Sequence, residues 1–409
     1  MAGLLYQISI VLYWFAAKVA ALFNPKAKLF TAGRKSIWHD LDQCFPKQNV
    51  VWFHAASLGE FEQGRPVMEE LKKRHPELNL LVTFFSPSGY EERKNYALAD
   101  VFYLPLDTKS NAKKFIKMVN PKLAVFIRYE FWAHYLDELR KNNIPTAVIA
   151  AQFRKDQFAF SFWGGFIRER IKNLNEIMVQ YKSAETLLLT YDFAPTNISI
   201  CGDSRFDRVL ETVNQAQEIS EIAQFKGDSP LVILGSCYAA EEDFVKEAFE
   251  KHPDWKFIYA PHYVDDNYVN ALVNRLPGKA VKFTEFKSGD ERILVLNTIG
   301  KLASAYAYGE IAVVGGGFKD GIHNILEAAA FGLPLFFGPN HKSFPEAQAL
   351  LDEGLAMEID KKGAAKKRLE ELIINRSLRE EKRTKLKNFV AKHAGATTCI
   401  VANLEKHLS

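Results

Sequence analysis

Cysteine is scarce in this sequence, and none of it stands in a metal-binding pattern. The 409 residues include only four cysteines, Cys44, Cys201, Cys237 and Cys399, which are far apart and form no CxxC or CxxxC pair. Isolated cysteines of this kind are typical of proteins from a reducing compartment. We therefore expect neither a disulfide framework nor a zinc site. A chain of this length also buries a large core without such links.

A strong excess of charge of one sign is absent as well. The 53 Lys and Arg residues nearly balance 49 Asp and Glu residues, which gives a formal net charge of +4. This mild charge is compatible with an anionic substrate or a membrane surface, and it does not require a nucleic-acid partner. No low-complexity segment or repeat of solenoid length occurs. The length and the 48% hydrophobic content predict two or three globular domains.

One long apolar run is present, at the N-terminus. Residues 3–23, GLLYQISIVLYWFAAKVAALF, contain a single charge, Lys18, and the basic stretch 26–35 follows. About twenty apolar residues suffice to cross a bilayer, and basic residues after the run favour the cytoplasmic side. No basic region precedes the run, which disfavours a signal peptide. We expect a membrane anchor that spans the bilayer or lies in its interface; the alternative is a helix packed on its own domain.

From residue 50 onward, apolar strand-like runs alternate with amphipathic helical stretches. The expected strands are residues 49–55, 79–85, 100–105, 122–128, 145–151 and 176–180, and later 230–236, 255–260, 292–297, 310–317 and 333–338. Their continuous hydrophobicity indicates strands buried on both faces, as in a parallel sheet covered by helices. The pattern predicts an α/β protein with two Rossmann-like doubly wound domains.

The domain boundaries follow from where this pattern pauses. We expect an anchor and basic segment at residues 1–35 and a first α/β domain at 36–210. A linker is expected at 211–229, and a second α/β domain at 230–409 closes with helices.

A glycine-rich turn in the second domain suggests nucleotide binding. Residues 310–339 read as strand, glycine turn, helix and strand, and the glycines at 315–317 would let a phosphate approach backbone amides. A helix starting near His323 and Asn324 would add free N–H groups. Glu327, three residues after Asn324, could hold ribose hydroxyls. The pattern is neither GxGxxG nor a P-loop, and the alternative is a turn whose glycines only permit a tight bend.

In the first domain, a buried strand leads into a short turn with a carboxylate. Residues 54–60 read HAASLGE. Ser57 and Glu60 have the S-x-x-E spacing of a helix capping box. Glu60 would also lie at the C-terminal end of a parallel strand, where doubly wound sheets bind ligands and where a carboxylate could act as a general base. The spacing alone leaves both interpretations open.

Five segments together resemble a known family. They are HAASLGE (54–60), FFSPSGYE (84–91), YEFW (129–132), GDSRFD (202–207) and GGGFKDGIHNILEAAAFGLPLFFGP (315–339). They are similar to the bacterial 3-deoxy-D-manno-octulosonic acid (Kdo) transferases of lipid A synthesis, over nearly the whole chain. The resemblance implies the GT-B arrangement, CMP-Kdo as donor, a lipid A precursor as acceptor and inversion at the anomeric carbon. It also implies that no metal or other cofactor is needed. The expected location is the cytoplasmic face of the bacterial inner membrane.

The resemblance assigns roles to residues of the first domain. It implies that Glu60 is the general base and that Glu130 is a second active-site acid; the alternative for Glu130 is a carboxylate at a helix start. Many relatives carry an acid where this chain has Arg128, so Arg128 either binds an anionic group or pairs with Glu130. Ser57 and Gly59 would let the acceptor sugar come close.

Donor contacts are expected in and near the second domain. The candidates are Arg205, Ser236, His262, Gly300, Gly316, Gly317, Lys319, His323, Asn324 and Glu327. The chain has Ala260 where many relatives have an arginine, so Arg205 and Lys319 are the expected partners of the phosphate. Lys301 stands where many relatives have an acid, and the cytosine base would then face the backbone at Gly300.

A basic and aromatic stretch is a candidate acceptor surface. Residues 153–172, FRKDQFAFSFWGGFIRERIK, include Arg154 and Arg168 among aromatic side chains. Such a mixture suits the phosphates of a lipid at a membrane surface, and no nucleic-acid-binding module accompanies it. The alternative is an amphipathic helix with solvated charges. The expected acceptor contacts are Ser57, Gly59, Arg128, Arg154 and Arg168.

Two other functions fit parts of the sequence. A sugar-nucleotide epimerase can share the two-domain architecture, but it needs neither an apolar anchor nor a basic aromatic surface. A non-catalytic nucleotide sensor at a membrane would not need the two carboxylates Glu60 and Glu130.

Overall fold

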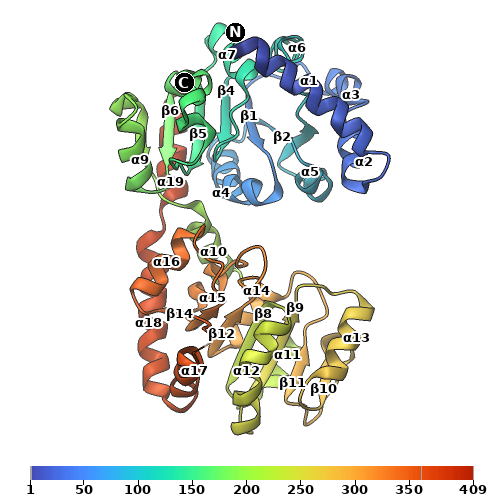
Figure 1. Cartoon of the computed structure of the whole chain (residues 1–409), viewed down its shortest axis with the longest axis vertical. Coiled ribbons are helices and arrows are strands. Elements are labelled where there is room, and N and C mark those ends of the chain that lie inside the picture. The colour runs from blue at the N-terminus through green and yellow to red at the C-terminus, as the bar shows by residue number, and fades with distance from the viewer. Residues whose placement is uncertain (1, 361, 409) are drawn as a thin grey trace. The chain divides into compact units, whose positions relative to one another are not determined.

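The computed structural model describes residues 2–360 and 362–408. The chain forms two compact units. Unit 1 comprises Met1–Asp207 and Ala394–Ser409, and unit 2 comprises Arg208–His393. Each unit has a central sheet with helices packed against it (Figure 1).

Unit 1 is built on a seven-stranded parallel sheet in the order β3-β2-β1-β4-β5-β6-β7. Its strands are β1 (Val50–Ala55), β2 (Asn79–Phe84), β3 (Ala99–Tyr103), β4 (Leu123–Ile127), β5 (Thr146–Ala151), β6 (Glu176–Val179) and β7 (Ile198–Ile200). Its helices are α1 (Ala2–Ala20), α2 (Pro25–Ala32), α3 (Ile37–Cys44), α4 (Leu58–Arg74), α5 (Pro87–Arg93), α6 (Lys109–Val119), α7 (Ala133–Lys141), α8 (Gly165–Lys172), α9 (Lys182–Leu189) and α19 (Ala396–Glu405). The 3₁₀ turns η1 (Phe158–Phe160), η2 (Phe162–Gly164) and η3 (Pro195–Asn197) lie between them, and α10 (Ser204–Asn214) runs from unit 1 into unit 2.

The sheet of unit 1 separates two hydrophobic cores. Successive side chains of a strand point to opposite faces. Accordingly, Trp52 of β1 packs in the core that includes residues of α6 and α7. Its neighbours Val51 and Phe53 pack in the other core, with residues of α4 and α19. Both faces are therefore dry, which explains the continuous apolar runs in the sequence.

Unit 2 repeats this architecture with strands in the order β10-β11-β9-β8-β12-β13-β14, all parallel. Its strands are β8 (Leu231–Cys237), β9 (Lys256–Pro261), β10 (Ala280–Lys282), β11 (Ile293–Val295), β12 (Ile311–Val314), β13 (Leu335–Phe337) and β14 (Ala356–Glu358). Its helices are α11 (Ser220–Lys226), α12 (Ala239–Lys251), α13 (Asp266–Arg275), α14 (Leu302–Ala305), α15 (Leu326–Phe331), α16 (Pro345–Asp352), α17 (Ala364–Ile374) and α18 (Arg376–His393), with 3₁₀ turns η4 (Phe283–Glu285) and η5 (Tyr306–Tyr308). The prediction of two doubly wound α/β domains is confirmed.

The unit boundaries differ from the predicted domains in two places. Helix α11 falls inside the predicted linker 211–229, but it belongs to unit 2. Helix α19 was expected in the second domain, but it returns to unit 1. There Ile400, Val401 and Leu404 are fully buried against the sheet and α4. The apolar face of α19 predicts a helix, but nothing in it predicts which sheet it covers.

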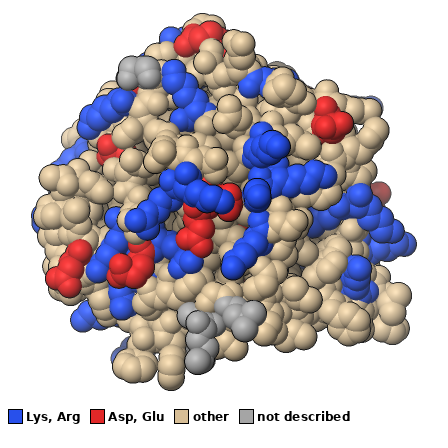
Figure 2. Space-filling model, turned by 90° about the horizontal axis from the view of Figure 1, so that it is seen from above, with Lys and Arg blue, Asp and Glu red and all other residues tan. Residues whose placement is uncertain are grey.

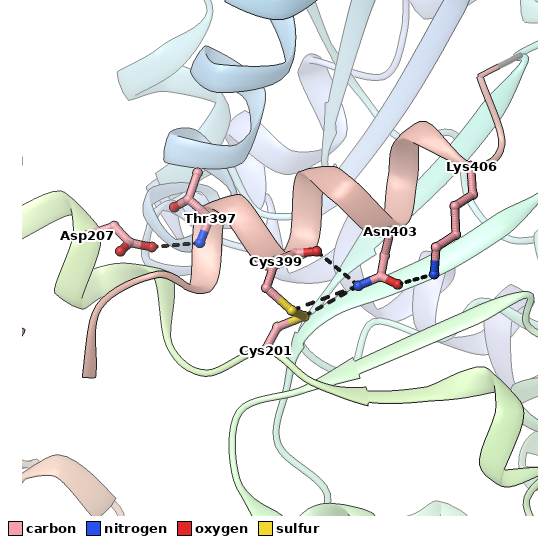
Figure 3. Close-up of a disulfide and its surroundings, with 6 residues drawn as sticks. All are labelled: Cys201, Asp207, Thr397, Cys399, Asn403 and Lys406. Atoms are coloured by element: carbon pink, nitrogen blue, oxygen red, sulfur yellow. Dashed lines mark hydrogen bonds between the residues drawn. A yellow bond between two sulfur atoms is a disulfide. The ribbon is translucent and has the colours of Figure 1, made fainter. Parts of the chain in front are cut away.

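The expectation of no disulfide is wrong for one pair of cysteines. Cys201, just after β7, and Cys399, in α19, form a disulfide although 198 positions separate them (Figure 3). Nearby, the amide of Asn403 donates to the carbonyl oxygen of Cys399 at 2.9 Å. The two cysteines come together because α19 packs on unit 1. The spacing of the cysteines in the sequence does not predict this packing. Cys44 and Cys237 are free thiols.

The apolar N-terminal run forms α1, which packs on unit 1 along one side. Ile10 is buried, and the hydroxyl of Tyr6 donates to Asp107 Oδ2 at 2.6 Å. The opposite side leaves Leu12 and Phe15 63% and 67% exposed. Among residues 2–360 and 362–408, no helix has the length and apolar character needed to cross a membrane.

Candidate active site

Glu60 lies where β1 passes into α4. Its side chain is 5% exposed, and its Oε2 accepts a hydrogen bond of 2.5 Å from the backbone N–H of Ala56. Ser57 is the N-cap of α4, but its side chain makes no capping hydrogen bond. The predicted capping box is therefore wrong in its Ser57 half. The Glu60 carboxylate accepts from the amide that precedes the N-cap, and the backbone N–H of Ser57 also favours its ionised form.

The environment of Glu60 makes it a stronger base than a solvated carboxylate. Burial raises its pKa, while the Ala56 N–H and the positive charge of Arg128 act in the opposite direction. A raised pKa is the condition that a carboxylate needs to take a proton from a sugar hydroxyl. Burial is thus the dominant influence on Glu60, although the residue lies at a helix start.

Glu130 lies in the loop after β4, the strand adjacent to β1. Burial raises its pKa to about 8, with the negative charge of Glu60 as the second cause. A carboxylate at a helix start would have a lowered pKa, and α7 begins only at Ala133. The structure thus brings Glu60 and Glu130 into one electrostatic unit at the C-terminal edge of the sheet.

Arg128 has a partner other than Glu130. Its Nη2 donates to Gln152 Oε1 at 3.0 Å, and its charge lowers the pKa of Glu60. The backbone at Arg128 adopts a left-handed conformation with φ of 69°, which is uncommon for a residue with a side chain. Its buried Nε has no hydrogen-bond partner among the described residues. A ligand acceptor atom would satisfy that donor.

A buried series of hydrogen bonds supports the loop that carries Glu130. It was not predicted from the sequence. Trp132 Nε1 donates to His54 Nε2 at 2.9 Å. Because an indole is only a donor, the His54 proton is on Nδ1, which donates to Thr83 Oγ1 at 2.9 Å. Burial lowers the pKa of His54 to about 3, so the ring is neutral. Trp132 follows Glu130 by two residues, and its anchorage fixes the loop. In the sequence, the only sign of these hydrogen bonds is the presence of polar residues within otherwise apolar strands.

Gly59 opens space beside Glu60. A Cβ atom at Gly59 would meet no described heavy atom within 4 Å. The protein itself therefore does not require glycine at this helical position. This fits the expectation that the acceptor sugar approaches here.

The basic and aromatic stretch is not one amphipathic helix. It forms η1, η2 and α8, and Phe162 and Trp163 of η2 are 89% and 78% exposed. Arg154 pairs with Asp156 at 3.2 Å, and Arg168 donates to the carbonyl oxygen of Ala159 at 2.8 Å. The two predicted acceptor arginines thus have partners within the segment. On the face of the molecule seen from above in Figure 2, Lys and Arg side chains form a band with some acidic side chains between them.

The glycine turn of unit 2 has two distinct roles. A Cβ at Gly315 would overlap the Ser236 carbonyl oxygen, and one at Gly317 would lie 2.6 Å from Gly338. Both glycines therefore allow close backbone packing, as the structural alternative predicted. Gly316 has φ of 93°, a conformation that favours glycine. Ser236, at the end of β8, also has a positive φ of 50°.

Several predicted donor residues meet in an aromatic cluster. The rings of His262 and His323 stack with centroids 4.7 Å apart. Tyr238 packs against both rings, and Lys319 Nζ lies 3.8 Å from the Tyr238 ring centroid. Burial lowers the pKa of His262, with the Lys319 charge as the second cause. Burial likewise lowers the pKa of His323. The cluster therefore places the Lys319 ammonium group beside two imidazole rings whose pKa values are lowered. Tyr238 was not among the predicted residues.

Glu327 and Asn324, three positions apart, form a hydrogen bond. Asn324 Nδ2 donates to Glu327 Oε1 at 2.9 Å, and burial raises the pKa of Glu327. The helix start is wrong, however, because α15 begins at Leu326 and has only six residues. Its dipole is correspondingly small, so the Asn324–Glu327 pair rather than the helix end is the polar feature here.

The remaining donor candidates have local contacts of their own. Arg205, in unit 1, forms an ion pair with Asp203 at 2.6 Å. Gly300 has φ of 85°, and a Cβ there would meet nothing within 4 Å. Lys301 Nζ lies 5.7 Å from the Phe283 ring centroid. No group of three or more His, Cys, Asp or Glu side chains in residues 2–360 and 362–408 is arranged to hold a metal ion.

Comparison with known proteins agrees with the motifs. Residues 31–208 match the family model of 3-deoxy-D-manno-octulosonic-acid transferase (kdotransferase). The predicted resemblance to Kdo transferases is confirmed. The 3-deoxy-D-manno-octulosonic acid transferase of Aquifex aeolicus is 26% identical over 84% of this chain and 94% of its own. The Haemophilus influenzae transferase is 25% identical over 81% of this chain and 80% of its own. These homologues are named as Kdo transferases, a family of glycosyltransferases.

Solved structures show the same fold at low identity. The UDP-GlcNAc 2-epimerase of Neisseria meningitidis aligns with a TM-score of 0.63 and 14% identity, over 87% of this chain and all (100%) of its own. MurG of Acinetobacter baumannii aligns with a TM-score of 0.54 and 14% identity, over 87% of this chain and 99% of its own. At this identity the likeness shows only the fold, two parallel-sheet α/β domains resembling GT-B glycosyltransferases. It does not separate transferases from epimerases.

Proposed function

We propose that this chain is an inverting glycosyltransferase that moves Kdo from CMP-Kdo to a lipid A precursor, a bisphosphorylated glucosamine disaccharide lipid. The sequence relatives favour this reaction over that of an epimerase, because homologues that align with most of the chain are named Kdo transferases. The observation that carries the proposal is the Glu60 carboxylate, buried beside the open space at Gly59.

In the proposed reaction, Glu60 is the general base. A hydroxyl oxygen of the acceptor sugar attacks the anomeric carbon of Kdo from the face opposite CMP. The new C–O bond forms as the bond to the CMP phosphate breaks, and that bond's electron pair leaves with CMP. The hydroxyl proton passes to Glu60. Glu130, whose pKa burial and the Glu60 charge raise to about 8, would hold its proton at neutral pH and act as a hydrogen-bond donor to the substrate.

The donor half of the proposal rests on unit 2. Lys319 supplies positive charge beside the His262–His323 stack, which suits a phosphate group. The Glu327 carboxylate, oriented by Asn324, would accept hydrogen bonds from the ribose hydroxyls. Backbone groups near Gly300 would face the cytosine base.

The direct test is incubation of the purified protein with CMP-Kdo and the tetraacylated disaccharide bisphosphate. We expect the mass of the lipid to increase by one or more Kdo units, as measured by mass spectrometry. A lipid of unchanged mass, with a donor that a known Kdo transferase consumes, would reject the proposal. An epimerase would instead convert a UDP-sugar without any acceptor.

Membrane association belongs to the same proposal, with the protein at the cytoplasmic face of the inner membrane. The exposed apolar side of α1 supports a helix lying in the interface. In a vesicle flotation assay, replacing Leu12 and Phe15 together by Glu should release the protein. Leu189→Glu, at an exposed leucine on α9, is the matched control. Undiminished flotation of the double variant would contradict the interfacial role of α1.

A further inference from the structure

An apolar groove of about 460 Å³ lies between α1, α2 and the loop after β2. On one side are Ala16, Ala17 and Ala20 of α1, and on the other are Ala27 and Phe30 of α2. The three alanines remove bulk where larger side chains would close the gap between the helices. The volume falls in the range of small-molecule sites, about 300–1,000 Å³.

The walls of the groove are held rigidly by one buried arginine. The Arg34 guanidinium donates to the carbonyl oxygens of Phe30 at 3.0 Å and Phe85 at 2.7 Å. It also stacks on the Phe30 ring, 3.9 Å from its centroid. Phe30 and Phe85 both line the groove. The groove is therefore a preformed feature rather than a loose contact between two surface helices.

One end of the groove adjoins the loop that carries Glu60. Ser86, which lines the groove, donates its backbone N–H to the Ala56 carbonyl oxygen at 2.8 Å. The N–H of the same Ala56 donates to Glu60. The Phe85 ring lies 4.6 Å from that of Trp132, two residues beyond Glu130. Ala56 thus links a residue that lines the groove to the proposed general base through two hydrogen bonds of its backbone.

The charge around the groove favours an anionic amphiphile. Lys26 lines the groove with its otherwise apolar walls. The first 39 residues contain five Lys and Arg residues and no Asp or Glu, so no acid of α1 or α2 competes for a phosphate. The exposed apolar side of α1 also connects the groove with the surface proposed to meet the membrane.

We propose that this groove binds an acyl chain of the acceptor lipid and thereby places the acceptor sugar beside Glu60. The inference rests on the proposed transferase function. It assigns the acceptor specificity to α1 and α2, which otherwise would only anchor the protein.

The first test is photocrosslinking with the full-length protein. The probe is the disaccharide bisphosphate lipid with a diazirine at the end of one acyl chain, presented in phosphatidylethanolamine vesicles. We expect mass spectrometry to locate the adduct on residues 13–30. A diazirine-labelled phosphatidylglycerol should give a much lower yield at the same sites. Adducts elsewhere, or equal yields from both lipids, would overturn the inference.

The second test fills the groove. Ala27→Trp should raise the KM for the acylated acceptor at least about tenfold, since two buried methylene groups account for such a factor. Transfer to the deacylated disaccharide should stay at the wild-type rate. Ala32→Trp, at an exposed residue of the same helix outside the groove, is the control and should leave both rates unchanged.

The two levels of the proposal fail in different ways. If wild-type protein transfers no Kdo to either acceptor, the proposed function is wrong, and the crosslinking still reports on the groove. If wild-type protein is active and Ala27→Trp keeps the wild-type KM for the acylated acceptor, the groove inference is wrong and the function stands.

Discussion

Glu60 and Glu130 follow the neighbouring strands β1 and β4, and burial together with the charge of Glu60 raises the pKa of Glu130 to about 8. Burial also raises the pKa of Glu60, but the Ala56 amide and Arg128 favour its ionised form, and Arg128 is not among the causes that act on Glu130. One site therefore holds two carboxyl groups in different electrostatic environments. This is the arrangement by which active sites assign an acid and a base.

Glu130→Gln should remove the alkaline limb of the pH profile. The pKa of Glu130 is raised, so its proton is held below about pH 8 and lost above it. A second carboxylate beside Glu60 would then disturb the site, and the wild-type rate should fall. Glutamine stays neutral, so kcat should remain level through that range. The measurement is kcat against pH; an unchanged fall near pH 8 would assign the limb to another group.

Glu60→Gln should lower kcat by roughly 10²–10⁴-fold, the usual contribution of a general base. The glutamine oxygen can still accept from the Ala56 N–H, so the fold and the CMP affinity should stay unchanged. Glu69→Gln on the same helix, where the carboxylate pairs with Arg65 and accepts a hydrogen bond from the Tyr96 hydroxyl, is the control. Loss of CMP binding in Glu60→Gln would indicate a structural rather than a catalytic role.

Gly59→Ala should separate substrate access from stability. No described atom lies within 4 Å of the new Cβ, and alanine favours a helix over glycine by up to about 1 kcal/mol. The melting temperature should therefore stay or rise while the KM for the acceptor increases. In the contrasting variant Gly64→Ala, the Cβ would overlap Ile127 and the protein should be less stable. An unchanged acceptor KM in Gly59→Ala would place the sugar elsewhere.

Glu327→Gln should weaken CMP binding about tenfold or more, the effect of losing a charged hydrogen-bond acceptor worth roughly 1.5–3 kcal/mol. Isothermal titration calorimetry with CMP measures the change. Glu371, an exposed residue of α17 paired with Arg368, provides a neutral control as Glu371→Gln. If the affinity for CMP is the same in both variants, Glu327 does not hold the ribose.

Most of the fold was predictable from the sequence, because the strands that are buried on both faces consist of continuous runs of apolar residues. The strands that the sequence missed are β7, β10 and β14, which lie at sheet edges and have three residues each. Such short strands are defined by pairing with a neighbour rather than by their own pattern. The position of α19 also depends on contacts across the chain.

The candidate site was predictable only where a motif carried it. Glu60 and Glu327 stood in recognisable patterns, and the Asn324–Glu327 hydrogen bond follows from their spacing. The His54–Trp132 hydrogen bond joins residues 78 positions apart, so no local pattern could indicate it. The same holds for the groove, whose walls come from three segments.

The disulfide between Cys201 and Cys399 gives a prediction about stability. In oxidised protein, Cys399→Ser should lower the free energy of unfolding of unit 1 by about 2–4 kcal/mol, because the link restricts the unfolded chain. Under reducing conditions the wild type and the variant should unfold alike. Cys44→Ser, at a free thiol, should behave as wild type in both. Denaturant unfolding with and without dithiothreitol measures the difference. Equal stabilities in the oxidised state would show that the link does not hold α19 against unit 1.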